Sequence, residues 1–166
     1  MKHLILITAL FLTAFVANAE QKFDEIMVND LYGQQIKLND YNLPHTRGML
    51  VNVWATWCKP CVKELPSLMK LQLKMPEITV VGLSIDRSPK IIKRFLKRYN
   101  YSPDYLVFLQ DPNGKQVKQF NILKVPTTLL LDSNGNIIDI IQGERNWSND
   151  LMLAKIRSKL DKAAKQ

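Results

Sequence analysis

Cys58 and Cys61 are the only cysteines in the chain, and two residues separate them. A valine-rich apolar run over residues 49–54 precedes the pair and is typical of a buried strand. Apolar residues recur at helical spacing after the pair, and Pro60 suits the first turn of a helix. The free N–H groups and the positive dipole end at such a junction favour the thiolate of Cys58 over the thiol. The pattern predicts a redox-active dithiol that can close into a disulfide.

Other uses of the cysteine pair fit the sequence less well. A zinc site needs four ligands, and beyond residue 19 the chain offers only His45 as a further soft donor, so we expect no metal. A structural disulfide over so short a loop would add little stability. A haem attachment site needs histidine directly after the second cysteine, where Val62 stands. Thiol–disulfide exchange is the best interpretation, and it needs no cofactor beyond the disulfide itself.

Residues 1–19 have the layout of a secretory signal peptide. A basic start is followed by the apolar stretch 4–16 and by Ala17-Asn18-Ala19, a small-x-small cleavage signal. The stretch is shorter than the ~20 residues that span a bilayer, which favours cleavage after Ala19 over a retained anchor. We therefore expect one exported domain, residues 20–166, in the periplasm or at the outer face of the cytoplasmic membrane. In an oxidising compartment such a pair needs a partner that sets its redox state.

The net charge of +8 invites a comparison with nucleic-acid-binding proteins. The cations fall mostly on two expected helices, over residues 90–98 and 155–165, without the interleaved aromatic residues of a nucleic-acid site. We interpret them as solvated helix faces, with weak attraction to an acidic membrane surface as the alternative. No nucleic-acid partner is expected.

Strands and helices alternate along the chain, which predicts an α/β layer fold. Right-handed crossovers would place parallel strands at the centre, and a final hairpin would add antiparallel ones, giving a mixed sheet with helices on both faces. A hairpin is expected over residues 23–38, and further strands over 49–54, 78–85, 105–109, 125–132 and 137–142. The first expected helix starts at Pro60, contains Pro66 and ends at Met75-Pro76. A second helix is expected over 89–99, a helical turn over 115–120, and a last helix capped by Ser148.

The motif Trp57-Cys58-Lys59-Pro60-Cys61, with Pro66 and with Val125-Pro126-Thr127, resembles the thioredoxin superfamily. The runs 51–58, 64–66 and 143–148 are most similar to its exported TlpA/ResA-like branch of thiol–disulfide oxidoreductases. The resemblance extends over residues 20–166. It implies a thioredoxin-like three-layer fold with an extra N-terminal β-hairpin.

The resemblance also implies roles for single catalytic residues. Cys58 would attack a partner disulfide, and Cys61 would resolve the mixed disulfide. Pro126 would be cis and would face the two cysteines. Glu64 matches an acidic residue associated with the thiols, and it could accept the proton of the resolving thiol. Asn52 stands where cytoplasmic thioredoxins carry a buried acid. Because asparagine cannot transfer a proton, this position cannot have that role here.

Further residues would dock the substrate. Trp57, Lys59 and Pro60 surround the attacking sulfur, and Lys59 also adds a positive charge that favours the thiolate. The main chain of Val125, with Thr127 beside it, could pair with an extended substrate segment. We expect Trp54 to lie in the core and interpret Trp147 as a packing residue.

The implied activity is reduction of protein disulfides, with the cysteines of apocytochrome c or of copper-site assembly proteins as substrates. A membrane-embedded thiol carrier would supply electrons to a monomer. A thiol peroxidase of the same superfamily is the first alternative, but Ala55 and Val51 stand where peroxiredoxins carry threonine and proline. A non-enzymatic copper-binding or holdase module is the second, and only His45 could add a ligand.

Overall fold

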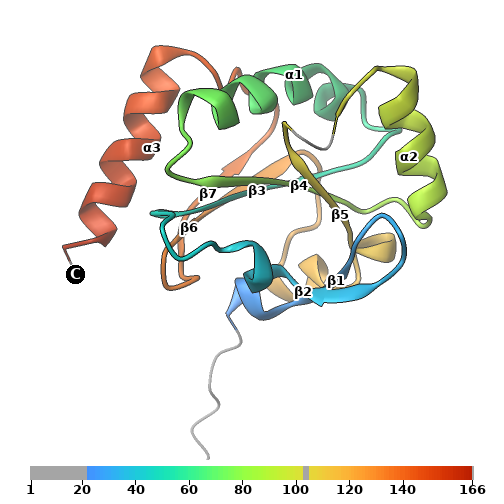
Figure 1. Cartoon of the computed structure of the whole chain (residues 1–166), viewed down its shortest axis with the longest axis horizontal. Coiled ribbons are helices and arrows are strands. Elements are labelled where there is room, and N and C mark those ends of the chain that lie inside the picture. Colours follow the sequence, from blue (N-terminus) through green and yellow to red (C-terminus); the bar gives the residue numbers. More distant parts are fainter. Residues whose placement is uncertain (1–21, 103–104, 166) are drawn as a thin grey trace, which may run out of the picture.

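The computed structural model describes residues 22–102 and 105–165, so the predicted signal peptide lies outside the described residues. Three α-helices and seven strands alternate much as the sequence predicts (Figure 1). The strands are β1 Met27–Asn29, β2 Gln35–Lys37, β3 Gly48–Trp54, β4 Thr79–Ser84, β5 Val107–Gln110, β6 Thr127–Asp132 and β7 Ile137–Gln142. The helices are α1 Lys59–Lys74, α2 Pro89–Arg98 and α3 Asp150–Ala163, with short 3-10 helices η1 Phe23–Glu25, η2 Leu38–Tyr41, η3 Pro112–Gly114 and η4 Val117–Phe120.

The strands form one mixed sheet in the order β2-β1-β5-β4-β3-β6-β7. The central strands β3, β4 and β5 are parallel, whereas β6 and β7 add antiparallel pairs. The predicted N-terminal hairpin is β1–β2, and it joins the sheet through the single register pair Asn29 and Gln110. Gly33 adopts φ 92° in its turn, a conformation that glycine tolerates best. The predicted mixed α/β fold is confirmed.

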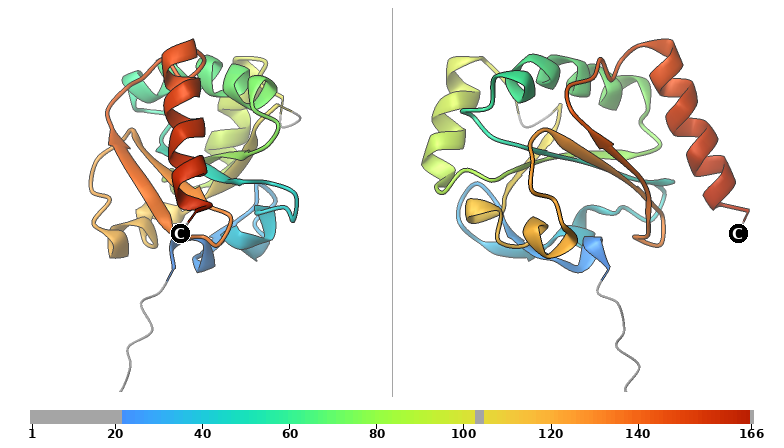
Figure 2. Two further views of the ribbon diagram at one scale, coloured as in Figure 1. Left: turned by 90° about the vertical axis from the view of Figure 1, so that its left-hand side faces the viewer. Right: turned by 180° about the vertical axis from the view of Figure 1, so that it is seen from behind.

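The sheet has different covers on its two faces. All three α-helices lie on one face, and the 3-10 helices η1, η2, η3 and η4 lie on the other (Figures 1 and 2). Buried residues of α1, α2 and α3 share a core with Leu50 and Trp54 of β3. Phe23, Leu38 and Val117, from the 3-10 helices, share the opposite core with the alternate side chains of the same strands. The helices that cover the face of the sheet opposite α1, α2 and α3 are therefore short 3-10 helices.

Local boundaries differ from the sequence expectation at several points. Asn149, rather than Ser148, caps α3, since its Oδ1 accepts the N–H of Met152 at 2.8 Å. Ser148 instead donates to Asn146 through its hydroxyl. Strand β6 begins at Thr127 rather than at residue 125. Helix α1 contains Pro66, as the sequence predicts.

Strand β3 positions the cysteine pair. It is buried along its whole length and lies between β4 and β6. Gly48 opens it where a Cβ would lie 2.1 Å from the Leu131 carbonyl oxygen, so no other residue fits there without movement. After Trp54 the chain turns directly into Cys58 at the start of α1. Within residues 22–102 and 105–165, no helix is both long and apolar enough to cross a bilayer.

Candidate active site

Cys58 and Cys61 form a disulfide at the N-terminus of α1, with an S–S distance of 2.08 Å. Cys58 is the N-cap residue, and its Sγ accepts the backbone N–H of Cys61 at 3.3 Å. Cys58 is 6% exposed, whereas Cys61 is fully buried. A thiolate at Cys58 would keep this N–H donor and the positive end of the helix dipole, which together favour the charged form. The first cysteine is thus the one that a partner can approach.

The other sequence-predicted site residues lie around this sulfur or at the neighbouring strand end. Trp57 is 66% exposed, and Lys59 and Pro60 are exposed on the first turn of α1. Because β3 and β6 pair in antiparallel register, the end of β3 lies beside the start of β6. The Val125–Pro126 bond that leads into β6 is cis.

The segment before β6 leaves main-chain groups available. Neither the N–H nor the carbonyl of Val125 forms a hydrogen bond with another described residue, and its side chain is half-buried. Thr127 is buried, and its hydroxyl donates to the carbonyl of Lys124 at 2.8 Å. This bond fixes the bend beside Val125, so the Thr127 side chain supports the segment from within rather than facing solvent.

Glu64 lies one turn after Cys61 on α1 and is 2% exposed. Its Oε1 accepts from the Asn52 side-chain amide at 2.7 Å. Its Oε2 accepts from the backbone N–H of Arg145 at 2.9 Å and from the indole N–H of Trp147 at 3.1 Å. Burial raises the pKa of Glu64 above its ordinary value, and the three hydrogen bonds oppose that rise without cancelling it. Glu64 is therefore a buried acid held by three donors, one from β3 and two from the loop after β7.

The partners of Glu64 include residues that the sequence analysis did not place in the site. Trp147 is fully buried and bonds to the carboxylate, so it does more than pack. Thr128 accepts from the Asn52 amide at 2.8 Å through its hydroxyl oxygen. The Asn52 Oδ1 is buried and has no hydrogen-bond partner among the described residues. Asn52 can rotate its amide to offer this oxygen to a protonated Glu64, while Thr128 can donate instead of accepting.

A pH dependence of stability follows from the raised pKa of Glu64. A group with a raised folded pKa binds its proton more tightly in the folded chain, so stability rises as the pH falls towards the ordinary value of 4.5. We expect the unfolding free energy of the wild type, minus that of Glu64→Gln, to increase as the pH is lowered from 7 to about 4.5. For a single proton the slope within this window cannot exceed about 1.4 kcal/mol per pH unit. Urea unfolding of the two oxidised proteins at several pH values measures it.

Glu64→Gln is a suitable reference because its amide oxygen can still accept from Arg145 and Trp147. Burial also raises the pKa values of Asp24 and Asp111, but both residues are present in the two proteins, so their contributions cancel in the difference. A difference that stays constant over this pH range would contradict the assignment of a raised pKa to Glu64.

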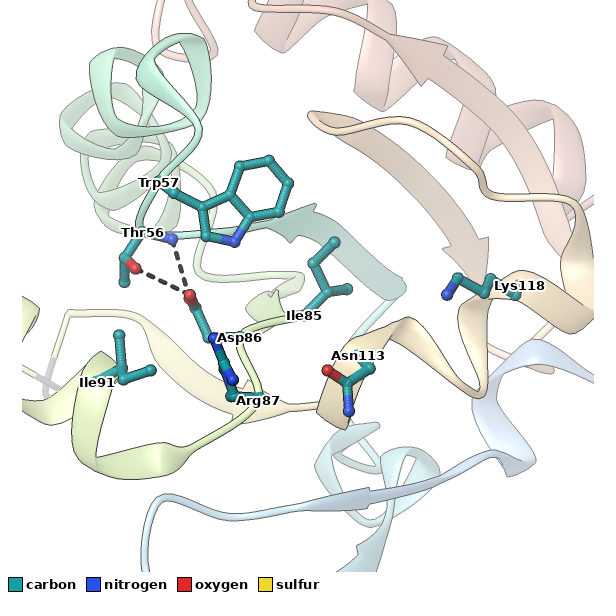
Figure 3. A pocket seen from close by; sticks show the side chains of 8 residues that line it. All are labelled: Thr56, Trp57, Ile85, Asp86, Arg87, Ile91, Asn113 and Lys118. Atoms are coloured by element: carbon teal, nitrogen blue, oxygen red, sulfur yellow. Dashed lines mark hydrogen bonds between the residues drawn. The ribbon is translucent and has the colours of Figure 1, made fainter.

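A pocket of about 540 Å³ opens beside Trp57 (Figure 3). Asp86 lies at its floor and is 3% exposed. It accepts from the N–H and the hydroxyl of Thr56, each at 2.9 Å, and from the hydroxyl of Ser84 at 2.8 Å. These bonds connect the loop before Cys58 to the end of β4 and so fix the path of that loop. Nothing in the local sequence pattern around Asp86 indicated this contact.

Among the described residues, no group of three or more histidine, cysteine or acidic side chains lies close enough together to hold a metal ion. His45, the additional donor considered from the sequence, is exposed in the loop before β3.

Comparison with known proteins places the chain in a family. Residues 19–140 match the model of the AhpC/TSA family. Thiol-disulfide oxidoreductase ResA of Bacillus thuringiensis subsp. konkukian is 33% identical over 121 residues, which is 72% of this chain and 66% of the relative. The chain thus spans slightly less than two thirds of that relative's length. Thioredoxin-like protein YneN of Bacillus subtilis is 32% identical over 127 residues, 74% of this chain and 71% of YneN.

Solved structures agree on the fold. A thiol:disulfide interchange protein from Bacteroides sp. superposes with a TM-score of 0.63 at 25% identity, covering 82% of this chain and 86% of its own. MTB DsbF gives a TM-score of 0.67 at 20% identity, covering 82% and 96%. The matched part of the chain includes the cysteine pair and the strand that precedes it. The chain therefore belongs to the AhpC/TSA family and has the thioredoxin-like fold, with relatives that are named thiol–disulfide oxidoreductases.

Proposed function

We propose that this protein is an exported thiol–disulfide oxidoreductase that reduces disulfides of other proteins. The observation that carries the proposal is the placement of the Cys58–Cys61 disulfide at the start of α1, where the Cys58 Sγ accepts a helix N–H and is the more accessible sulfur. The relatives named thiol–disulfide oxidoreductases support the same chemistry. A site that stabilises one thiolate and buries the second sulfur is suited to disulfide exchange in two steps.

The exchange begins with the reduced dithiol. The Cys58 thiolate attacks one sulfur of the substrate disulfide, forms a mixed disulfide and releases the other substrate sulfur as a thiolate. Cys61, after losing its proton, attacks the Cys58 sulfur, which closes the Cys58–Cys61 disulfide and releases the second substrate thiolate. Two electrons pass from the protein to the substrate. A thiol donor must then reduce the protein disulfide before the next cycle.

Glu64 is the residue we assign to the proton of Cys61. It follows Cys61 by one helical turn, it is buried, and its pKa is raised, so it can take up a proton under conditions in which an exposed glutamate would not. The unpartnered Oδ1 of Asn52 supplies an acceptor for the protonated form. Asn52 and Thr128 act through Glu64 and are positioning residues.

The substrates that we propose are the cysteines of apocytochrome c or of copper-site assembly proteins, and the proposed electron donor is a membrane-embedded thiol carrier. Both rest on the resemblance to the TlpA/ResA-like branch. The signal-like segment 1–19 supports export and cleavage after Ala19. We propose a monomer in the periplasm or at the outer face of the cytoplasmic membrane.

Substitution of the resolving cysteine tests the proposal. In Cys61→Ser, the first attack is retained and the second is lost, so we expect a mixed disulfide between Cys58 and its substrate to accumulate. Expression in the native host, followed by alkylation and mass spectrometry of the adducts, identifies what is joined to Cys58. Adducts that contain only glutathione or random abundant proteins would argue against a specific protein reductase, and wild-type protein provides the untrapped control.

A peroxide assay distinguishes the proposed disulfide reductase from the first alternative, a thiol peroxidase. If the protein is a disulfide reductase, reduced protein should reduce insulin or a disulfide peptide much faster than it consumes hydrogen peroxide. A thiol peroxidase would show the reverse order of rates.

A further inference from the structure

Two adjoining pockets form a groove next to the redox disulfide. The first has a volume of about 540 Å³ and the second about 380 Å³, and Trp57, Ile85 and Lys118 line both. The first extends towards the N-terminus of α2 (Figure 3), and the second continues to Val125, directly before the cis proline. A polypeptide segment lying in this groove would contact Trp57, the residue directly before Cys58, and Val125, the residue directly before the cis proline.

Exposed cations border the groove. Arg87 lines the first pocket, Lys124 lines the second, and Lys118 lines both. In the first pocket the Lys118 side chain points towards Ile85 (Figure 3). Lys59 is exposed directly after Cys58. None of these four forms an ion pair with a described residue.

The cations of α3 differ in this respect. Lys155 and Lys159 lie within 3.6 Å of the Asp139 carboxylate, and Arg157 bonds to Glu77. The four cations at the groove therefore have no ion-pair partner among the described residues, although Lys118 acts electrostatically on the buried carboxylate of Asp111. Three cations of α3, in contrast, are paired with acids.

The carboxylate that lines the groove is buried and already accepts hydrogen bonds. Asp86 is the one acid that lines either pocket, and its oxygens are occupied by Thr56 and Ser84. The segments 87–102 and 112–131, which form the two walls, contain no Asp or Glu. Trp57 and Leu123, the latter 74% exposed, add apolar surface. The groove thus offers apolar contact together with positive charge that forms no ion pair among the described residues.

We infer that the groove binds an extended, cysteine-bearing segment of the partner protein in which acidic side chains flank the disulfide. This inference rests on the proposed function, because it names the class of substrate for the same site. The free main chain of Val125 would pair with the segment. Arg87, Lys118 and Lys124 would meet its carboxylates. They determine specificity and association rate rather than the chemical step.

Three synthetic peptides with the same disulfide and with aspartate, serine or lysine on both sides test the inference. Reduced full-length protein is mixed with each, and the second-order rate of disulfide reduction is followed by acid quench and chromatography. We expect the aspartate peptide to react about 10-fold faster than the lysine peptide at low ionic strength. The difference should nearly vanish at about 1 M salt, where the Debye length is roughly 3 Å.

Matched charge reversals locate the effect. Lys118→Glu/Lys124→Glu should remove or invert the preference for the aspartate peptide. Lys162→Glu/Lys165→Glu changes the net charge equally at the end of α3 and should retain the preference. Both control residues are exposed and have no ion pair with a described residue.

Each other outcome has a definite consequence. Equal rates for the three peptides would overturn the inference while leaving the proposed function intact, and no reduction of any peptide would overturn both. A preference that survives the groove reversals would place the acidic-segment site elsewhere and overturn the assignment. Equal peptide rates, with groove-dependent sedimentation on phosphatidylglycerol vesicles, would assign the cations to an anionic bilayer instead.

Discussion

Cys58→Ser should lower the rate of protein disulfide reduction by roughly 10³-fold or more, the scale on which loss of a nucleophile reduces catalysis. A serine hydroxyl stays protonated at neutral pH, whereas the Cys58 thiolate is favoured by the Cys61 N–H and by the helix dipole, the latter worth about 0.3–1 kcal/mol. Turnover is measured with insulin or a disulfide peptide and a dithiol donor.

Cys61→Ser is the matched control for this experiment. It also loses turnover, but in a single-turnover mixture it should still form one mixed disulfide per protein, because the attacking sulfur remains. Cys58→Ser should form none. If the two variants exchanged these behaviours, Cys61 would be the attacking residue, against its complete burial.

Most of the fold could be predicted because its signals are local. Apolar runs marked the strands, the Tyr32-Gly33 turn marked the first hairpin, and Pro89 marked the start of α2. The order of these elements, with right-handed crossovers, determines the parallel centre of the sheet. Ser148 and Asn149 are both good N-cap residues, and only the geometry of α3 decides between them.

The surroundings of Glu64 could not be predicted because its partners are remote in sequence. Trp147 follows it by 83 residues and Arg145 by 81, and no periodicity links them. The sequence alone showed a glutamate three residues after a cysteine on a helix. Two of its three donors arise only when the loop after β7 packs over α1, and the third, Asn52, comes from β3. The same holds for Thr56 and Asp86, which are 30 residues apart.

The arrangement combines two opposite electrostatic environments within a short stretch of α1. At its N-terminus the Cys58 sulfur receives a hydrogen bond and a favourable dipole, so negative charge is stabilised there. One turn after Cys61, burial of Glu64 disfavours negative charge and raises its pKa. A proton therefore tends to leave the Cys58 sulfur and to stay near Cys61, which matches the order in which the two cysteines would act.

Glu64→Leu should lower the free energy of unfolding by about 3 kcal/mol or more, since it leaves three buried donors without an acceptor at roughly 1–3 kcal/mol each, partly offset by removal of a buried charge. Glu64→Gln, which keeps an acceptor for Arg145 and Trp147, should lose less than about 1.5 kcal/mol. The exposed residue Glu25 provides the control: Glu25→Leu should stay within about 0.5 kcal/mol of the wild type. Urea unfolding of the oxidised proteins at pH 7 measures all three. If Glu64→Leu were as stable as Glu64→Gln, the three hydrogen bonds would contribute little to the fold, and the carboxylate would be retained for its proton chemistry alone.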